Sequence, residues 1–458
     1  MHNTLLVWTN ELGSLYTFKL VEKLVLVVSD PAVFMKLAGN GPEALPKAAF
    51  AVQGAKELGP GPDGIFMLLD FHSEEYKTVR KTLAPAFSLE NVRNISPVAC
   101  EHAQHLASKW AGGLEVDKEG DCGATVSVAG NIDVMEDLKK SALSVFLNGV
   151  LCMEMGEAEK ETFLKNLQEG MAEVTLRVTN PLRQLIYNAM PFLPWSKRLA
   201  ENFAAVNDLW ILIFKRMREQ APYSETDFSL LACFWRLEHV HGFDDGRIRA
   251  SLAAFVVAGF ETNAGTVAWA LYDIASHNEV QKTLQTELRT AGLLHEEGSP
   301  NRGRPITWED LWGLPYFTAV LKESMRLHAI VATTSTIREA DRDVELGGYY
   351  VPKGTVVWAP LTCLHCSAHN WEDPLAFKPE RWLVPKGAKG DSEKAFHPFG
   401  YGPRNCIGQN LGNIVVRAML MELISSLWFD VPSCMGSVED VRAREEVGMT
   451  LKCRGRDL

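Results

Sequence analysis

The sequence predicts one mainly helical domain with small β-sheets, and three observations lead to this expectation. Between Leu89 and His328, most segments carry apolar residues at helical spacing. Alternating runs typical of strands occur only in two short stretches, 15–28 and 344–360. No internal repeat, low-complexity tract or linker divides the 458 residues. We therefore expect a single domain over residues 1–458, although length alone would allow about three.

The composition excludes several classes of protein. There are 46 basic and 57 acidic residues, and the resulting net charge of −11 argues against nucleic acid as a partner. Nine cysteines in so long a chain do not form a disulfide scaffold, which favours a reducing compartment. No apolar run reaches the roughly 18 residues of a membrane span, and no signal peptide is evident.

The first 90 residues predict a hairpin, a short helix, an irregular surface loop and a basic helix. These lie, in order, at Leu15–Val28, Pro31–Ala38, 39–66 and Glu74–Leu83. Asp30 supplies an N-cap before Pro31, and Pro85 ends the basic helix. Gly, Pro and Ala dominate the loop.

Helices separated by prolines and loops are predicted from Leu89 to His328, and strands follow them. Helical segments between Leu89 and Phe234 are broken at Pro181, Pro191, Pro194 and Pro222. A long helix follows from Asp244-Asp245 to about His277, and further helices are expected at Asn278–Ala291 and Pro315–His328. Between these two helices lie a loop at His295–Pro305 and a capping-box-like Thr307-x-x-Asp310, and strands are expected in Val344–Pro360. Gly347-Gly348 and Lys353-Gly354 mark the turns between these strands.

The stretch Phe399–Gly408 holds three glycines, one proline and one cysteine just before an apolar helical segment. Its glycines predict positive φ or a very close approach to a flat partner. Cys406 stands where the N–H groups of a helix N-terminus would favour a thiolate. Arg404 offers a fork of donors for a carboxylate. Together these features suit an iron porphyrin with propionates; taken alone, the cysteine would be a small buried hydrophobe in a turn.

The pattern F-x-x-G-x-R-x-C-x-G resembles the haem-binding loop of the cytochrome P-450 family, and every fixed position is filled here. The resemblance extends from about Leu15 to Leu451. It implies the family's triangular, helix-rich fold and a b-type haem (iron protoporphyrin IX) whose iron is bound by Cys406. It also implies haem-binding roles for Phe399, Arg404 and Gly408.

A second motif, Ala258-Gly259-Phe260-Glu261-Thr262, lies in the middle of the longest predicted helix. A mid-helix glycine costs about 1 kcal/mol relative to alanine, which indicates a close approach there. An acid and an alcohol in an apolar helix can relay protons, or can simply be a solvated edge and a threonine bonded to its own backbone. The motif is similar to the family's oxygen-activation motif, which implies that Glu261 and Thr262 are catalytic. Asn263 stands where the family more often has Thr or Ser.

A third constellation joins Glu323-x-x-Arg326 to Arg381, which lies in a P-E-R-W run before Cys406. On its own, the i, i+3 pair would be an exposed ion pair worth under about 0.5 kcal/mol. The combination resembles the family's structural triad beneath the haem loop. Ala329 follows His328 where the family usually has proline, which predicts a looser turn beside the substrate pocket.

Tyr76-x-x-x-Arg80 resembles the family's W-x-x-x-R, with tyrosine in place of tryptophan. The resemblance implies that Arg80 reaches a haem propionate and that Tyr76 supplies a phenol hydrogen bond. Arg338 is in register for a second propionate contact. Without the resemblance, both arginines would be interpreted as surface charges.

Cys363-Leu364-His365-Cys366, with His369 nearby, has the C-x-x-C spacing of a zinc or redox site. No second pair of ligands lies at a suitable distance, and Ser367 excludes the C-x-x-C-H haem attachment pattern. The sequence therefore favours a packed loop here over a metal site.

The resemblance implies a haem-thiolate monooxygenase that inserts one atom of O2 into a lipophilic small molecule. Two alternatives remain: a haem-thiolate isomerase or dehydratase acting on a peroxide without external electrons, and a non-enzymatic haem sensor. Thr262 favours the first reading. The expected pocket segments are 39–70, 165–215, 255–262, 330–337 and 447–450.

The chain has no G-x-G-x-x-G dinucleotide fingerprint, so electrons should come from NADPH through a separate reductase or ferredoxin. Lys77 and Lys81, on the helix of Arg80, are a candidate docking patch. The resemblance implies the endoplasmic reticulum membrane, with peripheral membrane contact. The given chain has no transmembrane anchor, so a cytoplasmic protein and a truncated one both fit.

Overall fold

The structure is a computed structural model. It describes residues 2–20, 22–49, 68–112, 114–116, 126–128, 132–179, 182–294, 304–333, 336–384, 390–431, 435–447 and 451–453.

Helices make up most of the described chain. They are α1 (His2–Leu12), α2 (Pro31–Ala38), α4 (Glu74–Leu83), α5 (Leu89–Arg93), α6 (Ser96–Gly112), α7 (Val134–Val145), α8 (Glu157–Thr179), α9 (Leu182–Ala189), α10 (Pro194–Glu219), α11 (Leu230–His239), α12 (Asp245–Ala275), α13 (Asn278–Thr290), α14 (Asp310–Gly313), α15 (Pro315–Leu327), α16 (Leu361–Cys366), α17 (Gln409–Ser426) and α18 (Val438–Ala443).

The strands are short and form four small sheets. They are β1 (Leu15–Leu20), β2 (Lys23–Val28), β3 (Leu114–Val116), β4 (Val126–Val128), β5 (Ile337–Glu339), β6 (Val344–Leu346), β7 (Tyr349–Val351), β8 (Val356–Trp358), β9 (Glu445–Val447) and β10 (Leu451–Cys453). The largest sheet has the order β1-β2-β8-β5, and the others are the pairs β3-β4, β6-β7 and β9-β10.

The predicted mainly helical fold with small sheets is confirmed. The hairpin β1-β2 pairs as expected, and Asp30 caps α2 by accepting from the Val33 N–H. Thr307 and Asp310 make the predicted capping-box hydrogen bonds.

The prediction of an irregular surface loop at 39–66 is wrong for its described part. Residues 39–49 are largely irregular, but Ala44, Leu45 and Ala48 are fully buried. Their side chains are apolar and pack beside α2 and β5, so this segment belongs to the core. Residues 50–66 lie outside the described part.

Three further features were not predicted. Helix α1 precedes the first strand, although Asn3 and Thr4 interrupt its apolar pattern. It packs on α16 and β1, and the Tyr16 hydroxyl donates to the Leu5 carbonyl. The hairpin β3-β4 interrupts the helical region. Pro194 begins α10 instead of breaking a helix, because its fixed φ suits the first turn.

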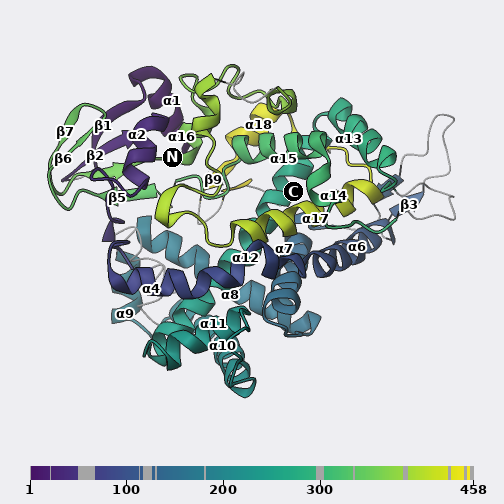
Figure 1. The fold of residues 1–458 in the computed structure, drawn as a ribbon, viewed down its shortest axis with the longest axis horizontal. Coiled ribbons are helices and arrows are strands. Elements are labelled where there is room, and N and C mark those ends of the chain that lie inside the picture. The colour runs from purple at the N-terminus through teal and green to yellow at the C-terminus, as the bar shows by residue number, and fades with distance from the viewer. Residues whose placement is uncertain are drawn as a thin grey trace.

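Figure 1 shows β1, β2, β5, β6 and β7 gathered at the left of the molecule, while helices form most of the rest, with β9 near the centre and β3 at the right. The 31-residue helix α12 runs through the middle and contacts α7, α15 and α17. Its central turns are almost entirely buried, so a polar group there is enclosed by protein. This arrangement places the middle of α12 against the loop before α17.

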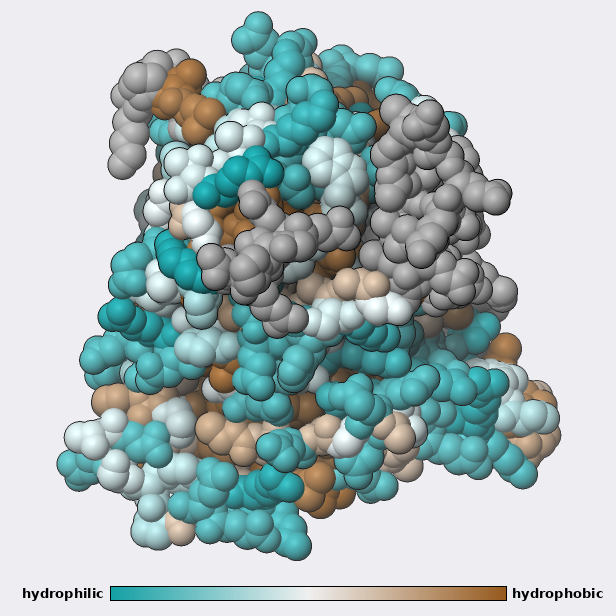
Figure 2. Space-filling model, turned by 90° about the vertical axis from the view of Figure 1, so that its right-hand side faces the viewer, coloured by the Kyte–Doolittle hydropathy of each residue, from teal (hydrophilic) through white to brown (hydrophobic). Residues whose placement is uncertain are grey.

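Figure 2 shows the face at the right-hand end of Figure 1, where hydrophilic residues cover much of the described surface. None of the helices in the described part of the chain combines the length and hydropathy that a bilayer-spanning segment needs.

Candidate functional site

The loop before α17 folds back on itself and presents Cys406. The Cys406 N–H donates to the Phe399 carbonyl at 2.8 Å, which closes the loop. Gly400 and Gly402 have φ of 73° and 72°, in the left-handed region, and a Cβ at Gly402 would lie 2.0 Å from the Ala38 carbonyl oxygen. The predicted positive φ is confirmed at both positions, and a close approach is found at Gly402 alone of the two, where the neighbour is the backbone of Ala38.

Gly408 is different. Its φ is −84°, and a Cβ there would make only van der Waals contacts, 3.9 Å from the Cys406 Sγ and 4.0 Å from Phe87. The described protein atoms therefore do not require glycine at this position. A flat group lying on Cys406 would need this space.

The Cys406 side chain is exposed to a cavity. Desolvation by the surrounding protein raises the pKa of its thiol above the ordinary value, and the Gly408 N–H and the Arg80 charge oppose this in part. The N–H groups at the start of α17 therefore favour the thiolate, as the sequence predicts, but they do not outweigh desolvation in the protein alone. A bound metal ion would supply the missing charge, because it deprotonates a coordinating thiol outright.

Helix α4 is hydrogen-bonded to the loop Phe399–Gly408, which we call the cysteine loop. The Tyr76 hydroxyl donates to the Pro403 carbonyl at 2.9 Å, and the Arg80 guanidinium donates to the Asn405 carbonyl at 2.8 Å. The Arg404 guanidinium lies over the Tyr76 ring, 4.4 Å from its centroid. Tyr76 and Arg80 thus bind the loop backbone directly as well as lining the cavity.

Four cationic side chains converge on one side of this cavity: Lys47, Arg80, Arg338 and Arg404. Burial, together with Arg404 and Arg338, lowers the pKa of Lys47 to about 7. Burial and Arg404 lower the pKa of Arg338 to about 10. Among the described residues that line the cavity, none is acidic. The cations therefore stabilise an anionic group placed in their midst.

The opposite wall is the middle of α12. A Cβ at Gly259 would lie 2.2 Å from Cδ2 of Phe146, so the aromatic ring occupies the space of a side chain. This confirms the predicted close approach at the mid-helix glycine. Thr262 lines the cavity and donates from Oγ1 to the Ala258 carbonyl at 2.7 Å, and Asn263 donates from Nδ2 to the Gly259 carbonyl at 2.6 Å.

Glu261 lies on another face of α12 and does not line the cavity. Its Oε2 is 3.7 Å from the Nζ of Lys139 on α7, and both side chains are buried. The sequence placed Glu261 and Thr262 in one proton relay, whereas the structure separates them on the helix surface. Adjacent helical residues differ by about 100° in direction, which explains the separation.

Beneath the loop, Glu323, Arg326 and Arg381 form the expected triad. Arg326 donates to both Glu323 carboxylate oxygens, at 3.0 and 2.8 Å, and Arg381 Nε donates to Glu323 Oε1 at 2.9 Å. Glu323 and Arg326 are fully buried. The pair is therefore an enclosed structural network, not the exposed ion pair that most E-x-x-R sequences form.

Helix α16 links this triad to the cysteine loop. Arg326 donates to the His365 carbonyl at 2.8 Å, and His365 Nε2 accepts from the His397 N–H at 3.0 Å, two residues before Phe399. Burial raises the pKa of the Cys363 thiol to about 12 and of the Cys366 thiol to about 11. The C-x-x-C run thus supplies packing and a loop-positioning histidine.

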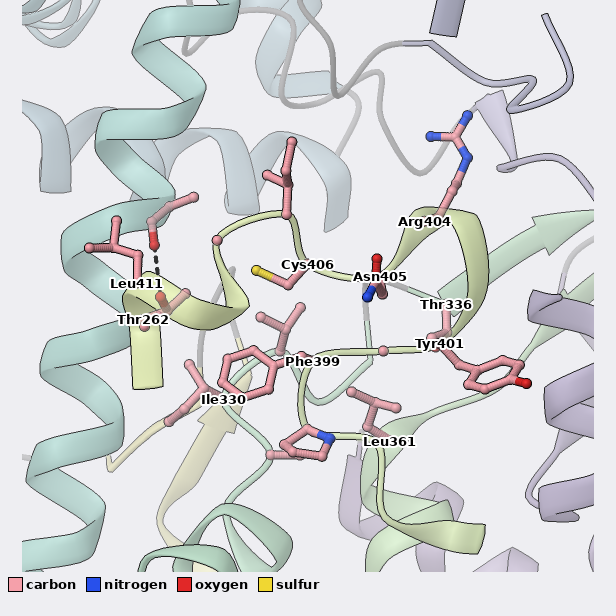
Figure 3. Close-up of a pocket in the computed structure, with 18 of the residues that line it drawn as sticks. Thr262, Ile330, Thr336, Leu361, Phe399, Tyr401, Arg404, Asn405, Cys406 and Leu411 are labelled. Carbon is pink, nitrogen blue, oxygen red and sulfur yellow. Dashed lines mark hydrogen bonds between the residues drawn. The ribbon is translucent and has the colours of Figure 1, made fainter. Parts of the chain in front are cut away.

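The cavity has a volume of about 320 Å³ and an apolar lining around its polar groups. We call it the Cys406 cavity. Figure 3 shows the Cys406 sulfur directed toward the side of α12 where Thr262 lies, with Phe399, Leu411 and Ile330 around them and Arg404 beyond the other end of the loop. A thiol on one wall, cations at one side and a glycine-sized space at Gly408 fit an iron porphyrin with two propionates.

A sequence model described as cytochrome P450 matches residues 1–449. The chain belongs to the cytochrome P450 family. Cytochrome P450 3A27 of Oncorhynchus mykiss is 34% identical over 194 residues, 42% of this chain and 35% of that protein. Cytochrome P450 3A16 of Mus musculus is 27% identical over 372 residues, 78% and 68% of the two chains. Cytochrome P450 3A25 of Mus musculus is 24% identical over 426 residues, 90% and 75%.

Membership of the cytochrome P450 family agrees with the fold and with the order of the motifs. The structure brings eight of the nine site residues named from the sequence to the Cys406 cavity: Tyr76, Arg80, Thr262, Arg338, Phe399, Arg404, Cys406 and Gly408. Glu261 is the ninth and lies outside it.

Sequence reasoning missed three residues of this cytochrome P450 site: Lys47, Lys139 and His365. Each lies far along the chain from the group it meets, so no short motif could show it. A weak signal existed for Lys47, the one cation in an otherwise neutral stretch from Leu45 to Ala55. Of the expected pocket segments, parts of 39–70, 255–262 and 330–337 line the cavity. The expectation for 165–215 is wrong for its described residues, none of which lines the cavity, and Val447 does not line it either. Residues 448–450 lie outside the described part of the chain.

Proposed function

We propose that this chain is a haem-thiolate monooxygenase that inserts one atom of O2 into a lipophilic small molecule. The observation that carries the proposal is the Cys406 cavity, where a cysteine sulfur faces a threonine hydroxyl on α12 across an apolar space. A single haem domain over residues 1–458 accounts for every constellation described above.

Cys406 would hold the haem iron through its sulfur, and the bound haem would supply the chemistry of oxygen activation, because a thiolate ligand donates electron density and favours O–O cleavage. Arg80, Arg338, Arg404 and Lys47 would hold the propionates. Thr262 holds its own proton in a hydrogen bond to the Ala258 carbonyl, so its Oγ1 lone pairs can accept a hydrogen bond from water in the cavity. That water could then deliver a proton on the α12 side.

The substrate class follows from the lining. Phe87 and Phe255 stack with centroids 5.3 Å apart, and Phe146 and Ile330 lie beside them in the cavity wall. These side chains exclude water, and each Å² of apolar surface that is removed from water contributes about 25 cal/mol of favourable free energy. Most of the polar groups that line the described part of the cavity lie on α12 or on the cationic side, and His328 adds one at the end of α15. The pocket therefore suits a lipophilic molecule with few polar groups.

Electrons would come from NADPH through a separate flavoprotein reductase or ferredoxin. Lys77 and Lys81 lie exposed on α4, the helix whose Arg80 reaches the cysteine loop. A partner docked on this face would be separated from Cys406 by a single helix. An acidic partner surface would be attracted there, and salt would weaken the attraction.

We place the protein at the endoplasmic reticulum membrane through peripheral contact. Ile186, Met190 and Phe192, at α9 and the turn after it, are 43%, 45% and 65% exposed. Three large apolar side chains within seven residues would bury their surface in the acyl boundary of a bilayer. Flotation with phosphatidylcholine vesicles tests this contact: Phe192→Asp should reduce the bound fraction, and equal flotation of both proteins would contradict it.

The central test is the carbon monoxide spectrum of the reduced protein. The thiolate-type ferrous–CO absorption is expected in the wild type and absent in Cys406→Ala, because no other cysteine lines the described part of the cavity, and the thioether of Met325 cannot form a thiolate. Retention in the variant would overturn the assignment.

Turnover then separates the three functions. A monooxygenase forms product only with NADPH and a reductase, an isomerase or dehydratase converts a peroxide without them, and a sensor does neither.

A further inference from the structure

His328 ends α15 in the wall of the Cys406 cavity. Its Nε2 lies 3.2 Å from Asp273 Oδ1 on α12, and its Nδ1 lies 3.3 Å from Glu445 Oε1 on β9. Its ring stacks on Trp269, with centroids 4.0 Å apart and planes 8° from parallel. The imidazole is therefore hydrogen-bonded through Nε2, paired with the Glu445 carboxylate at Nδ1, and stacked on one face.

The network continues to the start of the chain. His2 Nε2 on α1 contacts Glu445 Oε2 at 3.0 Å, so acid and base alternate through four buried side chains from four elements. A second cavity of about 280 Å³ lies on this side, and His328, Asp273 and Glu445 line it. His328 thus stands in the wall that separates the second cavity from the Cys406 cavity.

The charges around His328 favour its protonated form. Burial lowers the pKa of His328, but Asp273 and Glu445 outweigh burial and raise it to about 9. Burial raises the pKa of Glu445, but His2 and His328 bring it down to about 2. The other charged or titratable groups around the network and the second cavity are Arg326 on α15, Arg442 and Glu439 on α18, Lys378, and His277 after α12.

The segment after His328 faces the Cys406 cavity. Ala329, Ile330 and Val331 line it, and Ile330 packs on α12, since a Cβ at Gly265 would lie 3.4 Å from its Cδ1. The far end of the segment is anchored, because Trp358 Nε1 donates to the Thr333 carbonyl at 2.8 Å. Ala329 places no ring restraint on the turn, so the clamped imidazole anchors the near end.

We propose that His328 is a positioning residue, whose clamp by Asp273 and Glu445 fixes the wall segment Ala329–Val331 against the substrate space. The proposal depends on the proposed haem only because the experiment that tests it uses a ligand of the haem iron. The clamp is strong while the imidazole is charged. A folded pKa above the ordinary value of 6.5 means that this contribution is complete below about pH 6.5 and is lost as the pH rises through about 9.

The test is the affinity of the ferric protein for 4-phenylpyridine between pH 7 and 10, followed by the shift of the Soret band. This probe is uncharged throughout that range, and its phenyl group reaches past the iron to the wall. We expect a constant dissociation constant up to about pH 8 and at least a fivefold weakening with a midpoint near 9. His328→Lys, which keeps a cation, should bind like the wild type at pH 7, and His328→Phe should bind weakly at every pH.

A second variant keeps the proposal testable if His328→Phe does not fold. Glu445→Gln removes one of the two carboxylates, so the midpoint should fall by at least one pH unit. His277→Gln is the matched control, because His277 also lines the second cavity. Its Nδ1 contacts the backbone carbonyl of Asp273 and not a carboxylate, so this substitution should leave the pH profile unchanged.

Three results would overturn the proposal: a flat wild-type profile, an unshifted midpoint in Glu445→Gln, or loss of the transition in His277→Gln. The ferrous–CO spectrum, recorded on each sample, separates these outcomes from failure of the haem assignment itself.

Discussion

At the scale of single residues, several polar side chains of the site donate hydrogen bonds to backbone carbonyl oxygens. Tyr76, Arg80 and Thr262 each donate to a carbonyl, at Pro403, Asn405 and Ala258. Backbone positions move little, so these side chains have one orientation before any ligand binds. This preorganisation lowers the cost of placing a cofactor or a proton donor correctly.

Thr262→Ala should leave the ferrous–CO spectrum unchanged and lower the coupling of NADPH oxidation to product by at least about tenfold, since a positioned proton donor contributes that much or more. The electrons should appear instead as peroxide or water. Product and peroxide per NADPH are the measurement. Thr262→Ser keeps the hydroxyl and should retain coupling; wild-type coupling in the alanine variant would remove Thr262 from the relay.

Lys139→Met should destabilise the protein by about 3 kcal/mol, because it leaves the buried Glu261 carboxylate without its ammonium partner. Denaturant unfolding measures the change, and the double variant Lys139→Met/Glu261→Gln should recover much of it. The neighbouring Lys140 is a matched control: it pairs with the exposed Glu161 at 3.9 Å, and Lys140→Met should cost under about 0.5 kcal/mol. Equal losses at both lysines would contradict a buried pair.

At the scale of elements, α16 transmits the position of the triad to the cysteine loop. Its His365 joins the Arg326 guanidinium through the carbonyl and the His397 N–H through the ring. The four residues Cys363–Cys366, which look like a metal site in the sequence, belong to a helix that connects two parts of the fold. The acceptor role of Nε2 requires a neutral imidazole.

The pH dependence of stability follows from this element. Burial, His397 and Arg326 lower the pKa of His365 to about 3, so the unfolded chain binds a proton that the folded chain does not. The stabilising contribution is complete above about pH 6.5 and is lost progressively as the pH falls toward 3.

Thermal unfolding from pH 7 to 5 should show this loss in the wild type. His365→Gln keeps an acceptor and should have a shallower acid dependence, whereas His369→Gln, whose ring meets the Thr9 carbonyl, should keep the wild-type slope. Identical slopes in all three proteins would assign the acid sensitivity elsewhere.

At the scale of the whole molecule, the two sides of the Cys406 cavity serve different partners. The cysteine loop and α4 form one side, where an electron donor would approach, and α12 with its apolar neighbours forms the other. Residues from the first 50 positions and from the last 60 meet at this cavity, so the site depends on closure of the entire fold.

Lys77→Glu/Lys81→Glu should slow reduction by a reductase about tenfold at low ionic strength, and the difference should shrink as salt is added. Peroxide-driven turnover should not change. Lys282→Glu on α13 is the matched control, since Lys282 pairs with Glu279 as Lys77 pairs with Glu74, both at 2.8 Å or less. Helix α13 lies at the upper right of Figure 1, whereas α4 lies at the lower left. Loss in both assays would indicate a role in folding instead of docking.

The sequence by itself determined what depends on local backbone chemistry. Three local features could be predicted because each limits which residue can stand at a position. Positive φ favours glycine at Gly400 and Gly402, and the free N–H groups at the start of a helix favour a capping residue such as Asp30. The close packing at Gly259 leaves no space for a side chain. The cysteine loop was identified for the same reason.

Only the tertiary structure decided which groups meet across the chain. It turned Glu261 toward Lys139, brought Lys47 to Arg338 and Arg404, and placed His328 between Asp273 and Glu445. These partners are 55 to 357 residues apart along the sequence. No local propensity selects such pairs; packing of the core does, because a buried charge is stable only where the fold supplies its counter-charge.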